Sequence, residues 1–151
     1  MLTELCDYLK NWFDTNQPKR FATFTVSGGK VEGLDTMLQI GQYYRIVGSV
    51  FNDGVYKYSM EADENLTDEV FDGAVWAMAV PKRVIKLADD IAAWEEQYGG
   101  VNSAAMSPYQ SESFGGYSYS KASGGSSEDG TDNPGSWQAA FKSRLVRWRK
   151  I

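Results

Sequence analysis

The residues that could carry chemistry belong to few types. The chain contains no histidine and a single cysteine, Cys6. These counts exclude a Ser-His-Asp triad, a Cys-His pair and a zinc site built on histidine or on a cysteine cluster. Adjacent carboxylates occur at Asp63-Glu64, Asp89-Asp90 and Glu95-Glu96. A carboxylate-based hydrolase would need two such groups converging across a cleft, whereas adjacent acids on an amphipathic helix are typical of its solvated face. We therefore expect no enzyme, and no catalytic, metal-binding or cofactor-binding residue.

Two glycine-containing motifs are explained by turns. Ser27-Gly28-Gly29-Lys30 lacks the spacing of a phosphate-binding loop. Asn52-Asp53-Gly54 is typical of a tight hairpin turn, because glycine accepts the positive φ that such turns require.

The aromatic side chains are more informative about function than these turn motifs. They make up 14% of the chain, with five tryptophans and nine tyrosines. Tryptophan and tyrosine combine a large apolar area with a polar group and are enriched where proteins meet. For Trp76 and Trp94 we favour a core position. For Trp137 and Trp148 an interface and a core position remain equally open.

Periodicity indicates three helices and a strand-rich middle. Apolar residues recur at helical spacing from Leu2 to Phe13, and this first helix is expected to end before Pro18. A second helix is predicted over residues 81–98, and a third begins after Ser136. Between the first two, strands are predicted at Phe21–Val26, Lys30-Val31, Gly41–Val50, Val55–Tyr58 and Ala74–Val80, with a helical turn at Leu66–Gly73.

These elements predict an α+β fold. About three helices surround a small antiparallel, SH3-like sheet inserted between the first and second helices, with an extended arm and a C-terminal helix. The predicted organisation is an α+β body over residues 1–98, whose sheet-rich part covers about 20–80, an arm over 99–135 and an amphipathic basic helix over 136–151. The arm is assigned because residues 99–136 hold eight of the 15 glycines.

The charge is distributed unevenly. The chain has a net charge of −5, yet its last ten residues hold five bases and no acid, which leaves −10 for residues 1–141. An acidic body is poorly suited to holding duplex DNA, which requires a broad positive face. The longest apolar run, Ala74–Val80, is far too short to cross a bilayer, so we expect no membrane partner.

Several segments resemble a known family. The strings Gly41–Tyr56, Leu66–Gly73 and Val75–Pro81 are similar to a protein encoded in the head-morphogenesis cluster of tailed phages and prophages of Gram-positive bacteria. The stretch Ser111–Ser120 is similar to a segment of phage head–tail connector (adaptor) proteins, in which Ser-Glu is followed by glycine and Tyr-Ser. The resemblance covers roughly residues 20–121 and the C-terminal helix.

The resemblance implies a structural role in the virion. Members of that family are small non-enzymatic subunits, made in the bacterial host cytoplasm, that form a ring, commonly twelve-fold, at the head–tail interface. The ring lies under the capsid portal, meets the tail or a second neck protein, and continues the channel through which DNA passes without specific binding. This chain departs from all-helical adaptors in its strand-rich stretch over residues 21–80.

Two surfaces are the candidate contact sites. Phe114, Tyr117 and Tyr119 are expected to form a strand-like arm that pairs with a neighbouring subunit. The C-terminal helix is expected to dock on the portal protein through Trp137, Phe141, Arg144, Leu145, Arg147, Trp148 and Arg149. A monomeric SH3-like module that binds a peptide or single-stranded nucleic acid is the alternative from another functional class.

Overall fold

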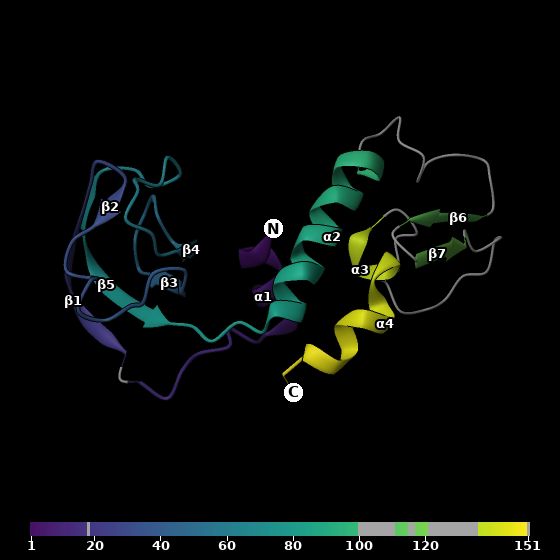
Figure 1. Cartoon of the computed structure of the whole chain (residues 1–151), viewed down its shortest axis with the longest axis horizontal. Coiled ribbons are helices and arrows are strands. Elements are labelled where there is room, and N and C mark those ends of the chain that lie inside the picture. Colours follow the sequence, from purple (N-terminus) through teal and green to yellow (C-terminus); the bar gives the residue numbers. More distant parts are fainter. Residues whose placement is uncertain (18, 100–110, 115–116, 121–135, 151) are drawn as a thin grey trace. The chain divides into compact units, whose positions relative to one another are not determined.

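The computed structural model describes residues 1–17, 19–99 and 136–150, and the backbone alone at 111–114 and 117–120. It combines helices with antiparallel sheets, which confirms the α+β class (Figure 1). In chain order the elements are α1 (Leu2–Leu9), β1 (Arg20–Ser27), β2 (Lys30–Val31), β3 (Tyr43–Val47), β4 (Gly54–Lys57), β5 (Glu69–Ala77), α2 (Lys82–Tyr98), β6 (Ser111–Phe114), β7 (Tyr117–Ser120), α3 (Trp137–Ala140), α4 (Lys142–Leu145) and the 3₁₀ turn η2 (Val146–Trp148).

The chain divides into two compact units. One, the sheet unit, is the continuous segment Asn11–Pro81. The other, the helical unit, combines α1 with the chain from Lys82 onward. The helical unit is therefore built from two stretches of sequence that are separated by the whole of the sheet unit.

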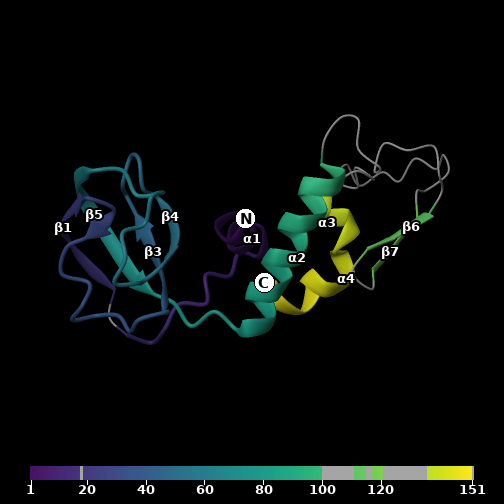
Figure 2. The same ribbon diagram turned by 45° about the horizontal axis from the view of Figure 1, so that its top comes forward.

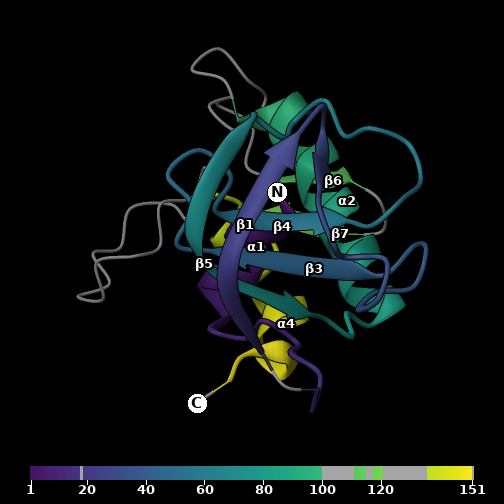
Figure 3. The same ribbon diagram turned by 90° about the vertical axis from the view of Figure 1, so that its left-hand side faces the viewer.

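The sheet unit contains a five-stranded sheet of order β2-β1-β5-β3-β4, in which every neighbouring pair is antiparallel. Strand β5 is central and long: its register pairs Glu69–Val75 with β1 and Ala74–Ala77 with β3. Figure 3 shows β1 and β3 crossing steeply, with β5 joining them. The sheet therefore curls around one core.

The core of the sheet unit lies on one face of the sheet. Along β1, Phe24 and Val26 are buried while Phe21 and Thr23 are exposed, which is the alternation expected of a strand with one buried face. Phe24 stacks on Phe71 of β5 with ring centroids 5.6 Å apart. The remaining core residues come from the strands and from the loops after β2 and before β5: Val31, Leu34, Leu38, Tyr44, Ile46, Leu66, Val75 and Ala77.

The helical unit is organised around α2. Its buried residues recur at helical spacing, as predicted: Val84, Leu87, Ala88, Ile91, Trp94 and Tyr98. Figure 2 shows α3 and α4 beside α2, and Trp94 meets Phe141 edge to face with ring centroids 6.4 Å apart. On α1, Leu5, Cys6 and Leu9 are fully buried.

The first helix is shorter than predicted. It ends at Leu9 because Lys10 adopts a left-handed conformation with φ 52°, and Phe13 does so too with φ 47°. The Asn11 side chain accepts a hydrogen bond from the Phe13 amide, which competes with helix continuation. The following backbone pairs with the end of the sheet, where Ala79 donates to the Phe13 carbonyl. Trp12 and Phe13 are therefore not part of the helical stripe.

The predicted helical turn at Leu66–Gly73 is wrong, because strand β5 begins at Glu69. Tertiary contacts override the local pattern here. Ser49, Val50 and Phe51 donate hydrogen bonds to the Glu69 carboxylate, which holds this residue against the loop between β3 and β4.

The predicted tight turn at Asn52-Asp53-Gly54 is also revised. Strands β3 and β4 do form a hairpin, but Gly54 already belongs to β4 and pairs with Ile46. The connecting loop therefore spans residues 48–53, and it is held by the buried Asn52 side chain.

The C-terminal helix is interrupted. Ser136 caps α3 as predicted, accepting from the Ala139 amide, but Phe141 leaves helical geometry with φ −106° and ψ 12°. One continuous helix is therefore replaced by α3, α4 and η2.

Candidate functional site

The apolar residues of the predicted portal-docking helix are buried within the helical unit. Trp137, Phe141 and Leu145 are 8%, 1% and 3% exposed. Trp137 packs edge to face on Tyr8, and Phe141 on Trp94. These side chains therefore hold the end of the chain against α1 and α2, which leaves only its other residues to contact a partner.

Arg144 is also engaged within the helical unit. Its guanidinium lies 2.6 Å from an Asp90 carboxylate oxygen, and Lys86 lies 3.2 Å from the other oxygen. Partial burial raises the pKa of Asp90, but the hydrogen bonds from Arg144 and Lys86 outweigh it and hold this pKa below its ordinary value of 3.8. Arg144 thus ties α4 to α2.

The basic terminal surface, which we define as Arg147, Arg149 and Lys150, is exposed. Arg147 lies over the half-buried Trp148 ring at 5.2 Å, and Arg149 over Tyr8 at 5.9 Å. The Lys150 amide donates to the Leu9 carbonyl, which fixes the backbone here. Of the predicted docking residues, Arg147 and Arg149 are the ones that present free charge to solvent.

The predicted subunit-interface arm is described only as backbone. β6 and β7 pair as an antiparallel hairpin in which Phe114 stands opposite Tyr117 and Glu112 opposite Tyr119. The rest of the proposed arm, residues 100–110, 115–116 and 121–135, lies outside the described residues. The pairing of Phe114, Tyr117 and Tyr119 with a neighbouring subunit stays a prediction.

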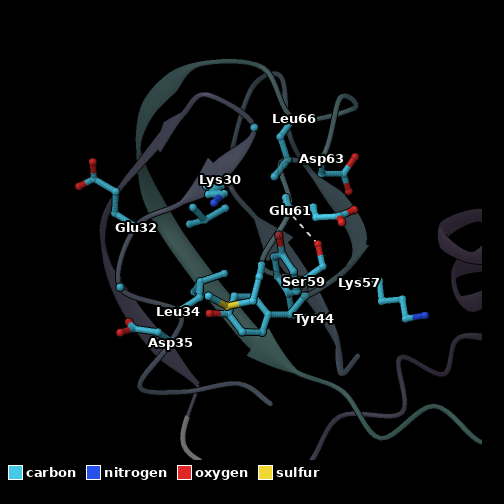
Figure 4. Close-up of a pocket in the computed structure, with 15 residues that line it drawn as sticks. Lys30, Glu32, Leu34, Asp35, Tyr44, Lys57, Ser59, Glu61, Asp63 and Leu66 are labelled. Atoms are coloured by element: carbon cyan, nitrogen blue, oxygen red, sulfur yellow. Dashed lines mark hydrogen bonds between the residues drawn. The ribbon is translucent and has the colours of Figure 1, made fainter. Parts of the chain in front are cut away.

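The sheet unit contains a pocket that the sequence did not indicate. Its cavity volume is about 260 Å³. One side is formed by the β1–β2 turn and the loop that follows β2, and the other side by the loop from Tyr58 to Leu66 (Figure 4). The Asp63 amide donates to the Gly29 carbonyl across it. A Cβ at Gly29 would lie 2.7 Å from the Asp63 carbonyl oxygen, so glycine is required for the two loops to approach.

The pocket has an apolar floor and an acidic rim. Val31, Leu34 and Leu66 are buried and line its interior. Four carboxylates also line it, against two ammonium groups. The acids are Glu32, Asp35, Glu61 and Asp63, and the bases are Lys30 and Lys57. In Figure 4 the side chains of Glu32 and Lys57 extend outward on opposite sides, while Glu61 and Asp63 lie close together on one side of the pocket.

Tyr44 contributes a polar group to the interior of this pocket. Its side chain is 3% exposed, and no hydrogen bond joins its hydroxyl to any residue that the structure describes. Burial raises the pKa of Tyr44 above its ordinary value of 10.0. The nearby charge of Asp63 and the phenol groups of Tyr56 and Tyr58 raise this pKa further. The hydroxyl therefore stays protonated and neutral.

Exposed apolar side chains form a second feature of the sheet unit. Val50, Phe51 and Val70 are 81%, 67% and 66% exposed. They lie near Glu69 along the backbone, because Glu69 precedes Val70 and accepts from the Val50 and Phe51 amides. We call these three residues the apolar tip. Phe21, on β1, is 74% exposed.

The outer face of the sheet also carries alternating rings and cations. Arg45 stands opposite Trp76 in the register of β3 and β5, and its guanidinium lies 3.3 Å from the Trp12 ring centroid. The Lys19 ammonium group lies over the Trp76 ring, 3.8 Å from its centroid. These contacts fix Trp12 and Trp76 within the sheet unit, so they do not form an open stacking surface.

Among the described residues, no group of three or more Asp, Glu, Cys or His side chains is placed to hold a metal ion. No helix in that part of the chain has both the length and the apolar composition of a membrane span. Comparison of the chain with family models, with curated proteins and with solved structures finds no significant match.

Proposed function

We propose that the chain is a non-enzymatic structural subunit of a phage neck. In this proposal copies of it form an oligomeric ring, commonly twelve-fold in such assemblies, between the capsid portal and the tail. The observation that carries the proposal is the apolar tip. Three large apolar side chains, each about two thirds or more exposed and all near Glu69 along the backbone, support a surface that another protein covers.

The ring requires two different contact surfaces on each subunit, because only a heterologous contact repeats around a rotation axis. The apolar tip of the sheet unit is one candidate. The segment of β6 and β7 that carries Phe114, Tyr117 and Tyr119 is the other, and its Ser111–Ser120 stretch carries the resemblance to connector proteins.

Portal docking is assigned to the basic terminal surface. Arg147, Arg149 and Lys150 project from the end of the helical unit, while Trp137, Phe141 and Leu145 anchor that end internally. Removing residues 136–151 would therefore expose the helical core as well as delete the surface. Charge reversal tests the contact more cleanly.

The first experiment uses the double variant Arg147→Glu with Arg149→Glu. The full chain is mixed with portal particles from the phage whose genome encodes it, and attachment is imaged by electron microscopy. We expect the wild type to form rings on the portal and the variant to lose them. Lys82→Glu with Arg83→Glu changes the same charge on exposed residues of α2 and should attach like the wild type.

Failure of the wild type to attach would overturn the neck assignment. Attachment of the double variant at wild-type level would overturn only the docking surface. Circular dichroism of both variants shows whether the helices are retained, so a loss of folding cannot be mistaken for a loss of contact.

The channel proposal follows from charge. Residues 11–81 carry ten Asp and Glu against five Lys and Arg. Such a surface repels phosphates, so DNA would pass without adhering. We expect no retention of duplex DNA by the isolated protein at low salt in a filter-binding assay, and tight binding would contradict the proposal.

The pocket of the sheet unit favours a second candidate, a monomeric SH3-like module that binds a peptide. The five antiparallel strands and the curled sheet of this unit are compatible with that finer fold description. The two candidates differ in assembly. A module stays monomeric beside portal particles and binds a short ligand, whereas a neck subunit assembles on them.

A further inference from the structure

We propose that the pocket between the β1–β2 turn and the Tyr58–Leu66 loop binds a lysine or arginine side chain presented by a partner protein. The aliphatic part of that side chain would lie on Leu34 and Leu66, and its charged end would lie beside Glu61 and Asp63, which lie close together in Figure 4. The proposal is independent of the neck assignment, because the pocket can be tested whether or not the chain attaches to a portal.

The size of the pocket fits a single side chain. Cavities that hold drug-sized ligands usually span 300–1,000 Å³. This pocket, at about 260 Å³, falls below that range. Its buried aliphatic lining would desolvate methylene groups, which favours a long, flexible side chain over a bare inorganic cation.

The charge of the rim selects the sign of the ligand. The lining includes four acidic residues and two lysines, and Glu61 and Asp63 lie together on one side of it. Glu61 is exposed and Asp63 is half-buried, so a cation in the pocket could pair with both side chains at close range. The Asp63 Oδ1 atom accepts from the Asn65 amide and side chain, which orients this carboxylate.

Tyr44 adds a hydrogen-bond acceptor to the pocket, besides the acidic residues. Its side chain is 97% buried, it lines the pocket, and its hydroxyl has no hydrogen-bond partner among the described residues. The hydroxyl is not fully enclosed by protein, so a ligand in the pocket can reach it. An ammonium or guanidinium group donates hydrogen bonds and accepts none, so it would use the hydroxyl oxygen as an acceptor.

To test the proposal, the full chain is titrated with three amino-acid derivatives whose termini are blocked and uncharged. Binding is followed through amide chemical shifts by NMR. The probes are the Nα-acetyl, N-methylamide derivatives of lysine, arginine and norleucine. We expect the first two to shift residues around Tyr44 and Asp63, and norleucine, which keeps the aliphatic chain without the charge, to bind at least tenfold more weakly. Equal binding of norleucine would overturn the proposal.

Variants of the pocket sharpen the test. Glu61→Gln with Asp63→Asn should weaken the lysine probe at least about tenfold, because two of the four negative charges are removed. Lys30→Met should strengthen it severalfold, because a like charge leaves the rim. Glu64→Gln is the control for charge, since Glu64 is exposed and outside the lining, and it should change the affinity less than twofold.

Two further measurements test the role of the Tyr44 hydroxyl and the nature of the ligand. Tyr44→Phe removes only the hydroxyl and should weaken the lysine probe but not the norleucine probe, with thermal unfolding as the check on folding. Spermidine tests whether a free polyamine is the better ligand. Tighter binding of spermidine than of the lysine probe would overturn the assignment to a protein side chain.

Discussion

Glu69 shows how one side chain can organise a loop. Its carboxylate accepts hydrogen bonds from the Ser49 hydroxyl, from the Val50 and Phe51 amides and from the Asn52 side chain. The Ser49 hydrogen bond contributes most to lowering the pKa of Glu69 below its ordinary value of 4.5, and the other hydrogen bonds reinforce it against partial desolvation. The loop is therefore held by a charge.

This shift predicts an acid-dependent stability. Because the folded pKa of Glu69 lies below the unfolded one, its contribution is fully present above about pH 4.5 and is lost as the pH falls through the folded pKa. We expect Glu69→Gln to be less stable than the wild type at pH 7, with the difference shrinking below pH 4.5. Urea unfolding between pH 7 and pH 3 measures it, and a constant difference would contradict the assignment.

Asn52 is the second residue on which this loop depends. It is fully buried, its side-chain amide donates to the Thr67 carbonyl and to Glu69, and its oxygen accepts from the Thr67 amide. Asn52→Ala removes all three hydrogen bonds of a fully buried side chain, so we expect a loss of about 2–4 kcal/mol in the free energy of unfolding. Asn65→Ala, at an exposed position, should lose less than about 1 kcal/mol in the same urea titration.

The sequence could not reveal these roles. Asn52-Asp53-Gly54 matches a tight turn because asparagine, aspartate and glycine all favour turns for local reasons. Burial of Asn52 depends on Thr67 and Glu69, 15 and 17 positions later in the chain. A local motif carries no information about such a partner.

At the scale of elements, the close approach of β3 and β5 depends on a glycine. Gly73 lies within β5, and a Cβ there would stand 2.2 Å from the Val47 carbonyl oxygen at the end of β3. That contact is impossible for a side chain, so the two strands meet only where the Cβ is absent. In the sequence, the same glycine was interpreted as the stop of a helical turn.

Gly73→Ala should therefore separate the strands. We expect a loss of at least about 2 kcal/mol in the free energy of unfolding, since backbone must move to admit the methyl group. Gly28→Asn is the control: nothing lies within 4 Å of a Cβ there, and asparagine tolerates its φ of 55°. Urea unfolding of both variants measures the contrast, and equal stabilities would contradict the packing.

Elements with strong periodicity could be predicted and others could not. Helix α2 follows from the repeat of Val84, Leu87 and Ile91, and β1 and β2 follow from a β-rich run joined by Gly28-Gly29. The β-character of Glu69–Phe71 is imposed by pairing with Phe24–Val26 of β1. The break at Phe141 arises likewise from packing against Trp94 rather than from a helix-breaking residue.

At the scale of the whole molecule, the chain contains two cores. The sheet unit is centred on residues such as Phe24 and Phe71, and the helical unit on Trp94 and Phe141. The pocket belongs to the sheet unit, yet its acids come from positions 32, 35, 61 and 63 in two loops. Sequence patterns do not show that these loops meet, so the pocket could not be predicted, whereas the basic end of the chain could.

Because each unit has its own core, we expect a core mutation in one unit to destabilise that unit and not the other. Phe141→Ala removes a ring that is 1% exposed, so we expect the helical unit to lose about 3–5 kcal/mol. Amide hydrogen exchange should accelerate at Leu87 and Ile91 and remain unchanged at Ile46 and Val75. Equal acceleration in both units would show that they unfold as one.

The insertion of the sheet unit within the helical unit has a consequence during translation. The sheet unit is complete once Pro81 has left the ribosome, whereas α1 must wait for its partners at the far end of the chain. Cys6 is fully buried in the finished protein, so on nascent chains it should react with a maleimide until Trp137–Trp148 has emerged. Stalled chains of increasing length would show when this thiol becomes protected.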